Sequence, residues 1–363
     1  MKKIALFLLI LSFTPNVNAQ QLAAFNDYLN QFWAFEGGQF QKLEYLEIQD
    51  YQIGGVLIAY IDNGNNLKIY RNGKTETLLG GVPIMYTATD YLLGYSIYEQ
   101  LNVYDNGEIK LLSTEADGYV VQDSLIAWHN RIRQTIQVYY NNKIYTIEDG
   151  LIYNPVESFK LGDNTIAYIQ NSTKEFKLFY KGEVIVLDQF VEDLVFEAGR
   201  DIVAYIDIPD QAFKVFFKGE EYTLENFMPK SFQVGDEFMV YTDNLGHLKY
   251  FDGGEVITLT TYEPEFYNVT DRVVVFEEQG FFKTYCNNQV YIVERYIPSM
   301  YKIDWNTIAY LDQSRFVKAF QNCEHVSVSY EIVKELMLYR DLIIYVEGIN
   351  QTKIFFMGQV FQN

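Results

Sequence analysis

Cysteine and histidine are scarce in this chain, and their scarcity excludes two common ways of holding a protein together. Only two of the 363 residues are cysteine, so the fold must rest on a hydrophobic core and not on a disulfide framework. The three histidines, His129, His247 and His325, lie far apart, with no spacing typical of zinc ligands. No Asp-x-Asp-x-Asp-Gly loop for calcium occurs either. We therefore expect no metal site and no cofactor.

Positive charge and long apolar runs are also in short supply. Asp and Glu outnumber Lys and Arg by 48 to 28, which gives a formal net charge of −20. The acidic residues are dispersed and no basic stripe is available to bind a phosphate backbone, so we expect no nucleic-acid partner. No stretch of about 18 apolar residues occurs, and the sequence therefore predicts no transmembrane segment.

A short apolar run at the start of the chain has the form of a secretory signal peptide. Lys2 and Lys3 precede the apolar residues 4–13, and Val17-Asn18-Ala19 has the small residues of a cleavage site. We therefore expect residues 1–19 to be a signal peptide. Residues 20–363 would then form an exported repeat domain, either periplasmic or extracellular.

Motifs that mark common enzyme classes are absent as well. The chain contains no Gly-x-Ser-x-Gly nucleophile elbow and no Gly-x-x-x-x-Gly-Lys phosphate loop. A glycosidase needs only two carboxylates at a suitable separation, a condition that 48 acidic residues could meet without any recognisable motif. The sequence thus identifies no catalytic residue, and a carbohydrate-active hydrolase is kept only as an alternative.

Aromatic residues, by contrast, are abundant, and they recur at a nearly fixed interval. The chain contains 31 Tyr and 27 Phe. One aromatic position recurs every 34 to 40 residues, at Phe35, Tyr70, Tyr104, Tyr139, Phe179, Phe216, Phe251, Tyr285, Phe320 and Phe355. A second lies about ten residues before each of these, at Phe25, Tyr60, Tyr95, Trp128, Tyr168, Tyr205, Tyr241, Phe276, Tyr310 and Tyr345. A period of this length is typical of a solenoid, a propeller or an array.

Each repeat is predicted to contain four short strands, A to D, of about 4–7 residues. In the clearest repeat, strand B covers residues 165–168, strand C 176–180 and strand D 183–187. The C–D turns are two-residue pairs, and nine of the ten end in Gly or Asn, which suit a type I′ hairpin. The pairs are Gly37-Gly38, Asn72-Gly73, Asn106-Gly107, Asn141-Asn142, Lys181-Gly182, Lys218-Gly219, Gly253-Gly254, Asn287-Asn288, Asn322-Cys323 and Met357-Gly358.

The predicted strands B and C are apolar on both faces, as in Ile58-Ala59-Tyr60-Ile61, which is typical of a sheet covered on both sides. Propeller blades need such sheets because each blade packs against two neighbours. Through its Ile-Ala-Tyr-x-Asp and Lys-x-Tyr-x-Asn-Gly signals, the chain resembles exported β-propeller repeat proteins over residues 21–363. The predicted fold class is all-β, a β-propeller-like array of about ten 35-residue, four-stranded repeats.

The number of repeats leaves the closure of the array open. Ten repeats exceed the usual four to eight blades, and the first repeat has no clear strand A. The 40-residue interval between Tyr139 and Phe179 suggests a seam near residues 150–158. One large ring is the preferred prediction, and two five-bladed propellers or an open β-solenoid are the alternatives.

An acidic residue follows the strand B aromatic by two positions in seven of the ten repeats, at Asp27, Asp62, Asp207, Asp243, Glu278, Asp312 and Glu347. A ring of carboxylates could bind a cation or a sugar, which makes the four aspartates Asp62, Asp207, Asp243 and Asp312 weak binding candidates. The preferred interpretation is structural. Each acid would begin the B–C turn by bonding its own backbone, and would pair across the strands with a lysine five to seven residues later.

Trp33 and the two cysteines depart from the repeat pattern. Trp33 replaces the strand C lysine of other repeats, so it could be an exposed stacking platform for a sugar or a peptide. Trp128 occupies the strand B aromatic position and is predicted to be core. Cys286 and Cys323 lie at the C–D tips of consecutive repeats, where an oxidising compartment would permit a disulfide if the Cα atoms lie within about 7 Å. Blades that splay outward would instead leave two free thiols.

Rigid repeats that display many short loops suit recognition, and no catalytic constellation competes with that function. We therefore expect a non-enzymatic exported scaffold that binds a protein or glycan ligand through its propeller loops. A carbohydrate-active hydrolase on the same fold is the alternative.

Overall fold

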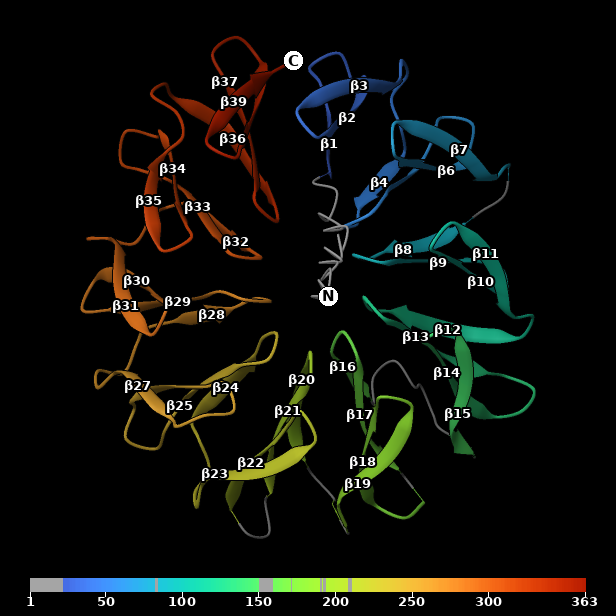
Figure 1. Cartoon of the computed structure of the whole chain (residues 1–363), viewed down its shortest axis with the longest axis vertical. Coiled ribbons are helices and arrows are strands. Elements are labelled where there is room, and N and C mark those ends of the chain that lie inside the picture. Colours follow the sequence, from blue (N-terminus) through green and yellow to red (C-terminus); the bar gives the residue numbers. More distant parts are fainter. Residues whose placement is uncertain are drawn as a thin grey trace, which may run out of the picture.

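Ten antiparallel sheets are arranged as a ring around a common centre in the computed structural model of the chain (Figure 1). The structure describes residues 22–81, 84–149, 159–170, 172–189, 191, 194–207 and 211–363. This part of the chain contains strands and no helix. The prediction of one large ring is confirmed, and the two-ring and open-solenoid alternatives are wrong. The predicted seam at 150–158 lies outside the described residues.

Consecutive strands along the chain make up each blade. Blades 1 to 5 contain β1 (Leu22–Asn26), β2 (Phe32–Glu36), β3 (Gln39–Glu44); β4 (Asp50–Ile53), β5 (Ile58–Ile61), β6 (Leu67–Arg71), β7 (Lys74–Leu79); β8 (Met85–Ala88), β9 (Leu92–Ile97), β10 (Gln100–Asp105), β11 (Glu108–Ser113); β12 (Ala116–Val121), β13 (Leu125–Asn130), β14 (Thr135–Tyr140), β15 (Lys143–Asp149); and β16 (Phe159–Leu161), β17 (Thr165–Gln170), β18 (Glu175–Tyr180), β19 (Glu183–Asp188).

The second half of the ring repeats the same arrangement. Blades 6 to 10 contain β20 (Val195–Gly199), β21 (Ile202–Asp207), β22 (Ala212–Phe217), β23 (Glu220–Glu225); β24 (Ser231–Val234), β25 (Met239–Thr242), β26 (Leu248–Phe251), β27 (Ile257–Thr260); β28 (Tyr267–Val269), β29 (Val274–Glu278), β30 (Phe281–Cys286), β31 (Gln289–Glu294); β32 (Tyr301–Asp304), β33 (Thr307–Leu311), β34 (Val317–Gln321), β35 (Glu324–Ser327); and β36 (Val333–Tyr339), β37 (Leu342–Glu347), β38 (Gln351–Phe356), β39 (Gln359–Gln362).

The core lies between the blades and not within them. Ten clusters of buried apolar side chains occur in the described residues, and each joins two neighbouring blades. The strand B aromatics that the sequence predicts are all buried, and the strand C aromatics are buried except for Tyr285, which is half-buried. Trp128 is 2% exposed, as expected of a core residue. Burial of both faces of each sheet explains why strands B and C are apolar on both faces.

The ring closes by packing of the last blade on the first. Blade 1 has three strands in the described residues, and its strands β1 and β2 pack against blade 10 in one of the ten clusters. The Phe35 ring lies 6.1 Å from the Phe356 ring and 5.3 Å from the Phe361 ring, centroid to centroid. Aromatic burial at this joint thus replaces a strand shared between the two ends of the chain.

Nine of the ten C–D pairs have positive φ at both residues, as a type I′ turn requires. Gly253-Gly254 is the exception, and the predicted two-residue turn there is wrong. Tyr250 pairs with Ile257, so the connection is longer than in the other blades, and only Gly253 has a positive φ. The extra residues remove the tight geometry that would have demanded positive φ at both positions.

The alternation of strand direction gives the ring two distinct faces. All A–B and C–D connections emerge on one side, which we call the turn face, and all B–C and D–A connections emerge on the other, which we call the loop face. The two faces can therefore carry different chemistry on the same scaffold.

Candidate functional site

The acidic ladder of the sequence lies on the loop face, where its carboxylates bond to their own turns. Oδ1 of Asp62 accepts backbone N–H groups of Gly64 at 2.8 Å and Asn66 at 2.9 Å. Oδ1 of Asp243 does the same for Leu245 and His247, both at 2.9 Å, and Asp312 follows the same pattern. These bonds define an Asx turn between strands B and C.

Each of the four candidate aspartates also pairs with the strand C lysine opposite the strand B aromatic. The Nζ–carboxylate distances are 2.8 Å for Lys68–Asp62, 2.5 Å for Lys214–Asp207, 3.1 Å for Lys249–Asp243 and 3.6 Å for Lys318–Asp312. Burial alone would raise the pKa of Asp62, but hydrogen bonds from Lys68 and Asn66 lower it to about 2. The ladder carboxylates are thus held in turns and ion pairs, which gives them a structural role whether or not they bind a ligand.

The same lysines join neighbouring blades. Glu44, at the end of strand D of blade 1, accepts a hydrogen bond from the Tyr60 hydroxyl at 3.1 Å and one from Lys68 at 2.7 Å. Glu225 and Glu294 bind the corresponding tyrosine and lysine of blades 7 and 9 in the same way. The repeated polar residues therefore form a Tyr–Glu–Lys–Asp network from one blade to the next.

Trp33 takes the place of the lysine in this network. Its indole Nε1–H donates to Oδ2 of Asp27 at 2.9 Å, and the Lys42 ammonium lies 4.6 Å from the ring centroid. The side chain is half-buried between these partners. Asp27 and Lys42 thus give Trp33 a structural role, and its use as a stacking platform stays a prediction.

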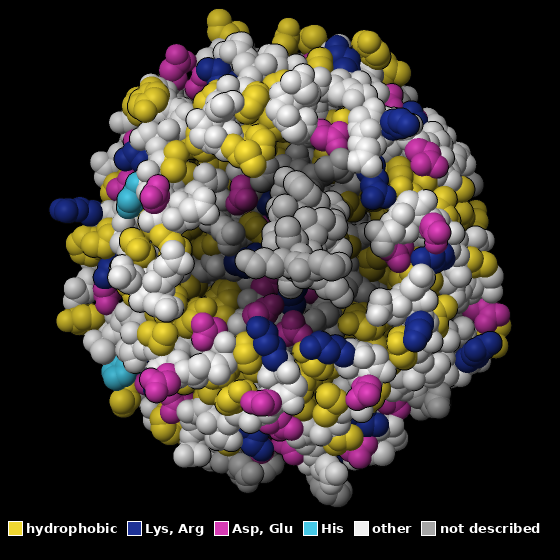
Figure 2. Space-filling model, viewed as in Figure 1, with side chains coloured by type: hydrophobic (Ala, Val, Ile, Leu, Met, Phe, Trp, Pro, Cys, Tyr) yellow, Lys and Arg dark blue, Asp and Glu magenta, His cyan; other side chains and the backbone are white. Residues whose placement is uncertain are grey.

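A second column of residues, most of them charged, lies at the A–B turns, five positions before each strand B aromatic. We call these residues the turn ring, and the described ones are Gly55, Asp90, Asp123, Asp163, Arg200, Asp236, Asp271, Trp305 and Arg340. Figure 2 shows acidic and basic side chains together around the centre of the ring. The sequence analysis missed this column, although the recurring Asp at a fixed offset from the aromatic ladder could have revealed it.

In the turn ring, Arg200 contacts the carboxylates of three other blades. Its guanidinium lies 3.0 Å from Asp163 through Nε, 3.2 Å from Asp123 through Nη2 and 3.7 Å from Asp236 through Nε. The backbone N–H of Asp236 also donates to the carbonyl of Asp271. Burial, and then the neighbouring Asp163 carboxylate, raise the pKa of both Asp123 and Asp236 to about 7.

Arg340 links blade 10 to blade 3 on the other side of the turn ring. Its guanidinium is paired with Asp90 of blade 3, and it lies 4.7 Å from the Trp305 ring, which Arg272 covers at 3.7 Å. A Cβ at Gly55 would come within 2.7 Å of Nη2 of Arg340, so the glycine makes room for this bridge. A cavity of about 90 Å³ lies beside the pair.

The described residues show no metal centre. No group of three or more His, Cys, Asp or Glu side chains among them is placed to hold a metal ion. The described part of the chain also has no helix of a length and hydropathy that would allow it to cross a membrane.

The loop face carries the most exposed apolar surface of the described chain. Seven large apolar side chains on connections around the joint between blades 10 and 1 are each more than half exposed. We call this set the apolar arc: Tyr28, Leu29, Tyr45, Leu46, Tyr330, Ile332 and Ile349. None of the seven belongs to the clusters that join the blades. The arc therefore contributes little to the fold.

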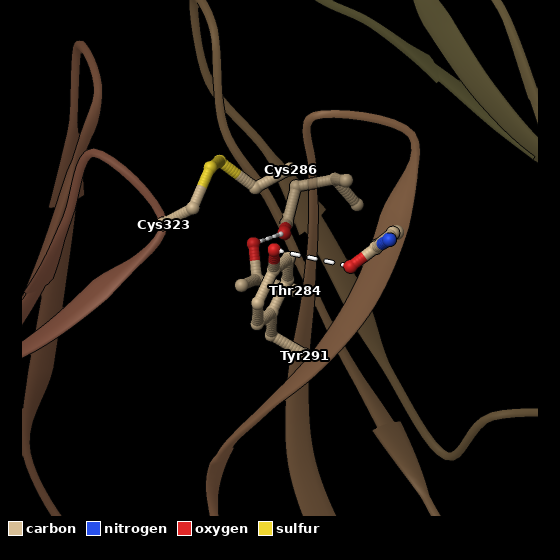
Figure 3. The surroundings of a disulfide bond; sticks show 6 residues. Thr284, Cys286, Tyr291 and Cys323 are labelled. Atoms are coloured by element: carbon tan, nitrogen blue, oxygen red, sulfur yellow. Dashed lines mark hydrogen bonds between the residues drawn. A yellow bond between two sulfur atoms is a disulfide. The ribbon is translucent and has the colours of Figure 1, made fainter.

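The two cysteines form a disulfide between the C–D hairpins of blades 8 and 9 (Figure 3). Their Cα atoms are 5.8 Å apart, within the reach of a disulfide. Cys286 follows the strand C aromatic directly, and Cys323 is the second residue of its turn, with φ 62°. A bonding partner on the adjacent blade explains why this turn alone among the ten pairs ends in cysteine.

A ring of ten β-blades with a charged ring of turns at its centre defines the class of protein. The chain matches the family model described as the 10-bladed beta propeller domain over residues 16–361, and it belongs to that family. The predicted resemblance to β-propeller proteins is confirmed at the level of architecture.

The chain is similar to solved structures only distantly. The computationally designed Ika8 protein is 11% identical over 93% of this chain and 100% of its own, with a TM-score of 0.38. Prp20p from Saccharomyces cerevisiae is 8% identical over 56% of this chain and 71% of its own, with a TM-score of 0.31. Hsv2 from Kluyvelomyces marxianus is 11% identical over 68% of this chain and 95% of its own, with a TM-score of 0.32. No curated protein matches the chain.

Proposed function

We propose that this protein is a non-enzymatic exported scaffold that binds a protein or glycan ligand through its propeller loops. The observation that carries the proposal is the apolar arc on the loop face. Exposed apolar surface of this extent is typical of interaction sites, and the packing of the blades does not need these side chains. A protein ligand on the loop face is therefore the favoured form of the proposal.

The composition of the arc supports recognition of a protein surface. Ile349 is 97% exposed and Tyr45 77% exposed, so both would lose a large apolar area on contact with a partner. Tyrosine also suits an interface because its ring buries well while its hydroxyl keeps a polar partner. Export rests on the signal-peptide pattern of residues 1–19, which lie outside the described residues.

The test compares two faces of the same blade. Ile349→Asp combined with Leu29→Asp places charge in the apolar arc, whereas Met357→Asp places it at the C–D tip of blade 10 on the turn face. Met357 is 78% exposed, so both changes should leave the fold intact. The exported protein is crosslinked on cells, and any captured protein is purified and titrated against all variants.

We expect the purified partner to bind the wild type and Met357→Asp equally, and to bind the arc variant about tenfold or more weakly. Equal binding by all three proteins would show that the apolar arc is not the interface with the partner. If no partner binds the purified protein, the scaffold proposal itself is contradicted.

The hydrolase alternative rests on the carboxyl groups of Asp123 and Asp236. A pKa of about 7 would suit a general acid at neutral pH. Arg200 nevertheless holds Asp123 and Asp163 in direct hydrogen bonds, which favours a structural role. Release of reducing ends from polysaccharides by the wild type, lost in Asp123→Asn, would establish the hydrolase instead of the scaffold.

A further inference from the structure

A polar groove runs between blades 3 and 4 on the turn face, outward from the turn ring. Its volume of about 570 Å³ is within the range of small-molecule sites. Tyr91 from the A–B turn of blade 3 forms one wall, and the C–D hairpins of the two blades contribute Asp105, Lys110, Tyr139 and Asn142. The groove is therefore built from connections of two blades and not from a single turn.

Tyr91 distinguishes this groove from its equivalents around the ring. It lies four positions before the strand B aromatic, and it is 49% exposed. In the nine described A–B turns, the residues at this position are Val56, Tyr91, Ser124, Asn164, Asp201, Glu237, Arg272, Asn306 and Asp341. Tyr91 is thus the single aromatic in the described column. A half-exposed ring beside a polar groove offers a flat face for the C–H groups of a sugar.

The opposite wall presents hydrogen-bond donors and acceptors side by side. The Tyr139 hydroxyl donates to Oδ2 of Asp105 at 2.6 Å, and Nζ of Lys110 donates to Oδ1 of Asn142 at 2.7 Å. Lys110 also lies 3.5 Å from Asp105 and 3.6 Å from Glu108. Sugar hydroxyls both donate and accept, so they can join such a network without leaving a charge unpaired.

The charge of the groove selects among sugars. Asp105 and Glu108 outnumber the one ammonium group of Lys110 in the lining. An anionic sugar would meet net repulsion there, whereas a neutral sugar would not. The corresponding groove between blades 8 and 9 is smaller, about 260 Å³, has Arg272 at the Tyr91 position and Asn306 at the Ser124 position, and is bordered by the Cys286–Cys323 disulfide.

We propose that the groove between blades 3 and 4 binds a neutral saccharide. The sugar ring lies against Tyr91, and its hydroxyls bond to Asp105, Lys110 and Asn142. This inference rests on the part of the proposed function that allows a glycan ligand, but it uses the turn face, opposite the apolar arc. The two sites can therefore be tested independently.

The test uses the whole exported protein on an array of neutral, sialylated and sulfated oligosaccharides, followed by calorimetric titration of the best neutral compound. Tyr91→Ala is the site variant and Tyr91→Trp the conservative variant. Asn306→Ala, which changes the lining of the groove between blades 8 and 9, is the control. We expect Tyr91→Ala to weaken binding by about tenfold or more, and Tyr91→Trp and Asn306→Ala to bind as the wild type does.

Three results would overturn the assignment: no binding of any neutral oligosaccharide, binding of anionic oligosaccharides only, or equal affinity of Tyr91→Ala and the wild type. Circular dichroism of Tyr91→Ala separates lost binding from lost folding, and retained binding by Tyr91→Trp supports the role of the aromatic face. If the arc variant still binds the saccharide while losing its protein partner, both sites stand. Protein binding without saccharide binding would remove the groove proposal alone.

Discussion

At the scale of single residues, the aromatic ladder was predictable from its repeat period, and the acidic ladder because its turn and lysine contacts are local in the sequence. Asp243 reaches its turn and Lys249 within six residues, so the spacing of the pattern carries the geometry. The turn ring was not predictable in the same way. Arg200 meets Asp123, 77 residues earlier, and only the closed ring brings the two side chains together.

The ladder yields a stability prediction at Asp243, whose side chain is 3% exposed. Asp243→Ala removes two backbone hydrogen bonds and the Lys249 ion pair, and should lower the free energy of unfolding by about 2 kcal/mol. Asp243→Asn should cost less because Oδ1 is kept. Urea unfolding of the single and double variants with Lys249→Met gives the coupling between the two residues.

The competing hypothesis, a cation site, predicts other results. An aspartate that served a ligand would leave stability unchanged when replaced, and millimolar calcium would raise the melting temperature of the wild type alone. We expect no calcium effect. A calcium-dependent rise of several degrees that vanishes in Asp243→Ala would move the ladder from the structure of the turn to ligand binding.

At the scale of strands and hairpins, the C–D tip of one blade contacts the end of strand C of the blade before it. The backbone N–H of Gly73 donates to Oε2 of Glu36 at 2.9 Å. Gly73 occupies the position of Cys323 in its blade, and Glu36 occupies the position of Cys286. The disulfide is thus the covalent version of a contact that recurs between blades. The sequence showed both positions, but the inward lean of the hairpins, which decides the bond, comes from blade packing.

This equivalence predicts how the disulfide can be replaced. Cys286→Ser with Cys323→Gly keeps the positive φ of the turn and removes only the link, which should lower stability by about 4 kcal/mol for a loop of this length. The melting temperature in non-reducing buffer is the measurement, and dithiothreitol should lower that of the wild type but not that of the variant. Two free thiols in the denatured, unreduced wild type would contradict the bond.

At the scale of the whole molecule, the repeat period specified the number of blades, while closure depended on contacts that no local pattern records. Blade 10 meets blade 1 where Phe35 packs against Phe356 and Phe361. Most of the chain separates Phe35 from these two residues. Nothing in the spacing of these residues distinguishes a closed ring from two smaller rings. The angle between neighbouring blades, added over ten interfaces, decides between one ring and two.

Maturation is predicted from the start of the chain. The small residues Val17 and Ala19 fit the rule for signal cleavage, so the exported protein should begin at Gln20 or Gln21. N-terminal sequencing of protein recovered from outside the cytoplasm is the measurement, with Ala19→Asp as a variant that should block cleavage. Recovery of protein that retains Met1 would contradict export through this signal.

The turn ring should give the whole molecule an unusual dependence of stability on pH. The pKa values of Asp123 and Asp236 are about 7 in the fold, whereas the pKa of an aspartate in an unfolded chain is about 4. Between these pH values the folded state holds more protons than the unfolded state. The free energy of unfolding must therefore fall as the pH rises through this window.

The ladder affects stability in a different pH range. Asp62 has a pKa of about 2, so its contribution to the free energy of unfolding is lost only as the pH falls below about 4. We therefore expect the melting temperature to be highest near pH 4 and to decline as the pH rises to about 7. Asp123→Asn combined with Asp236→Asn should flatten the decline, since the two amides do not titrate beside Arg200. A melting temperature that rises between about pH 4 and 7, or an unchanged slope in the double variant, would show that these carboxyl groups ionise without cost in the fold.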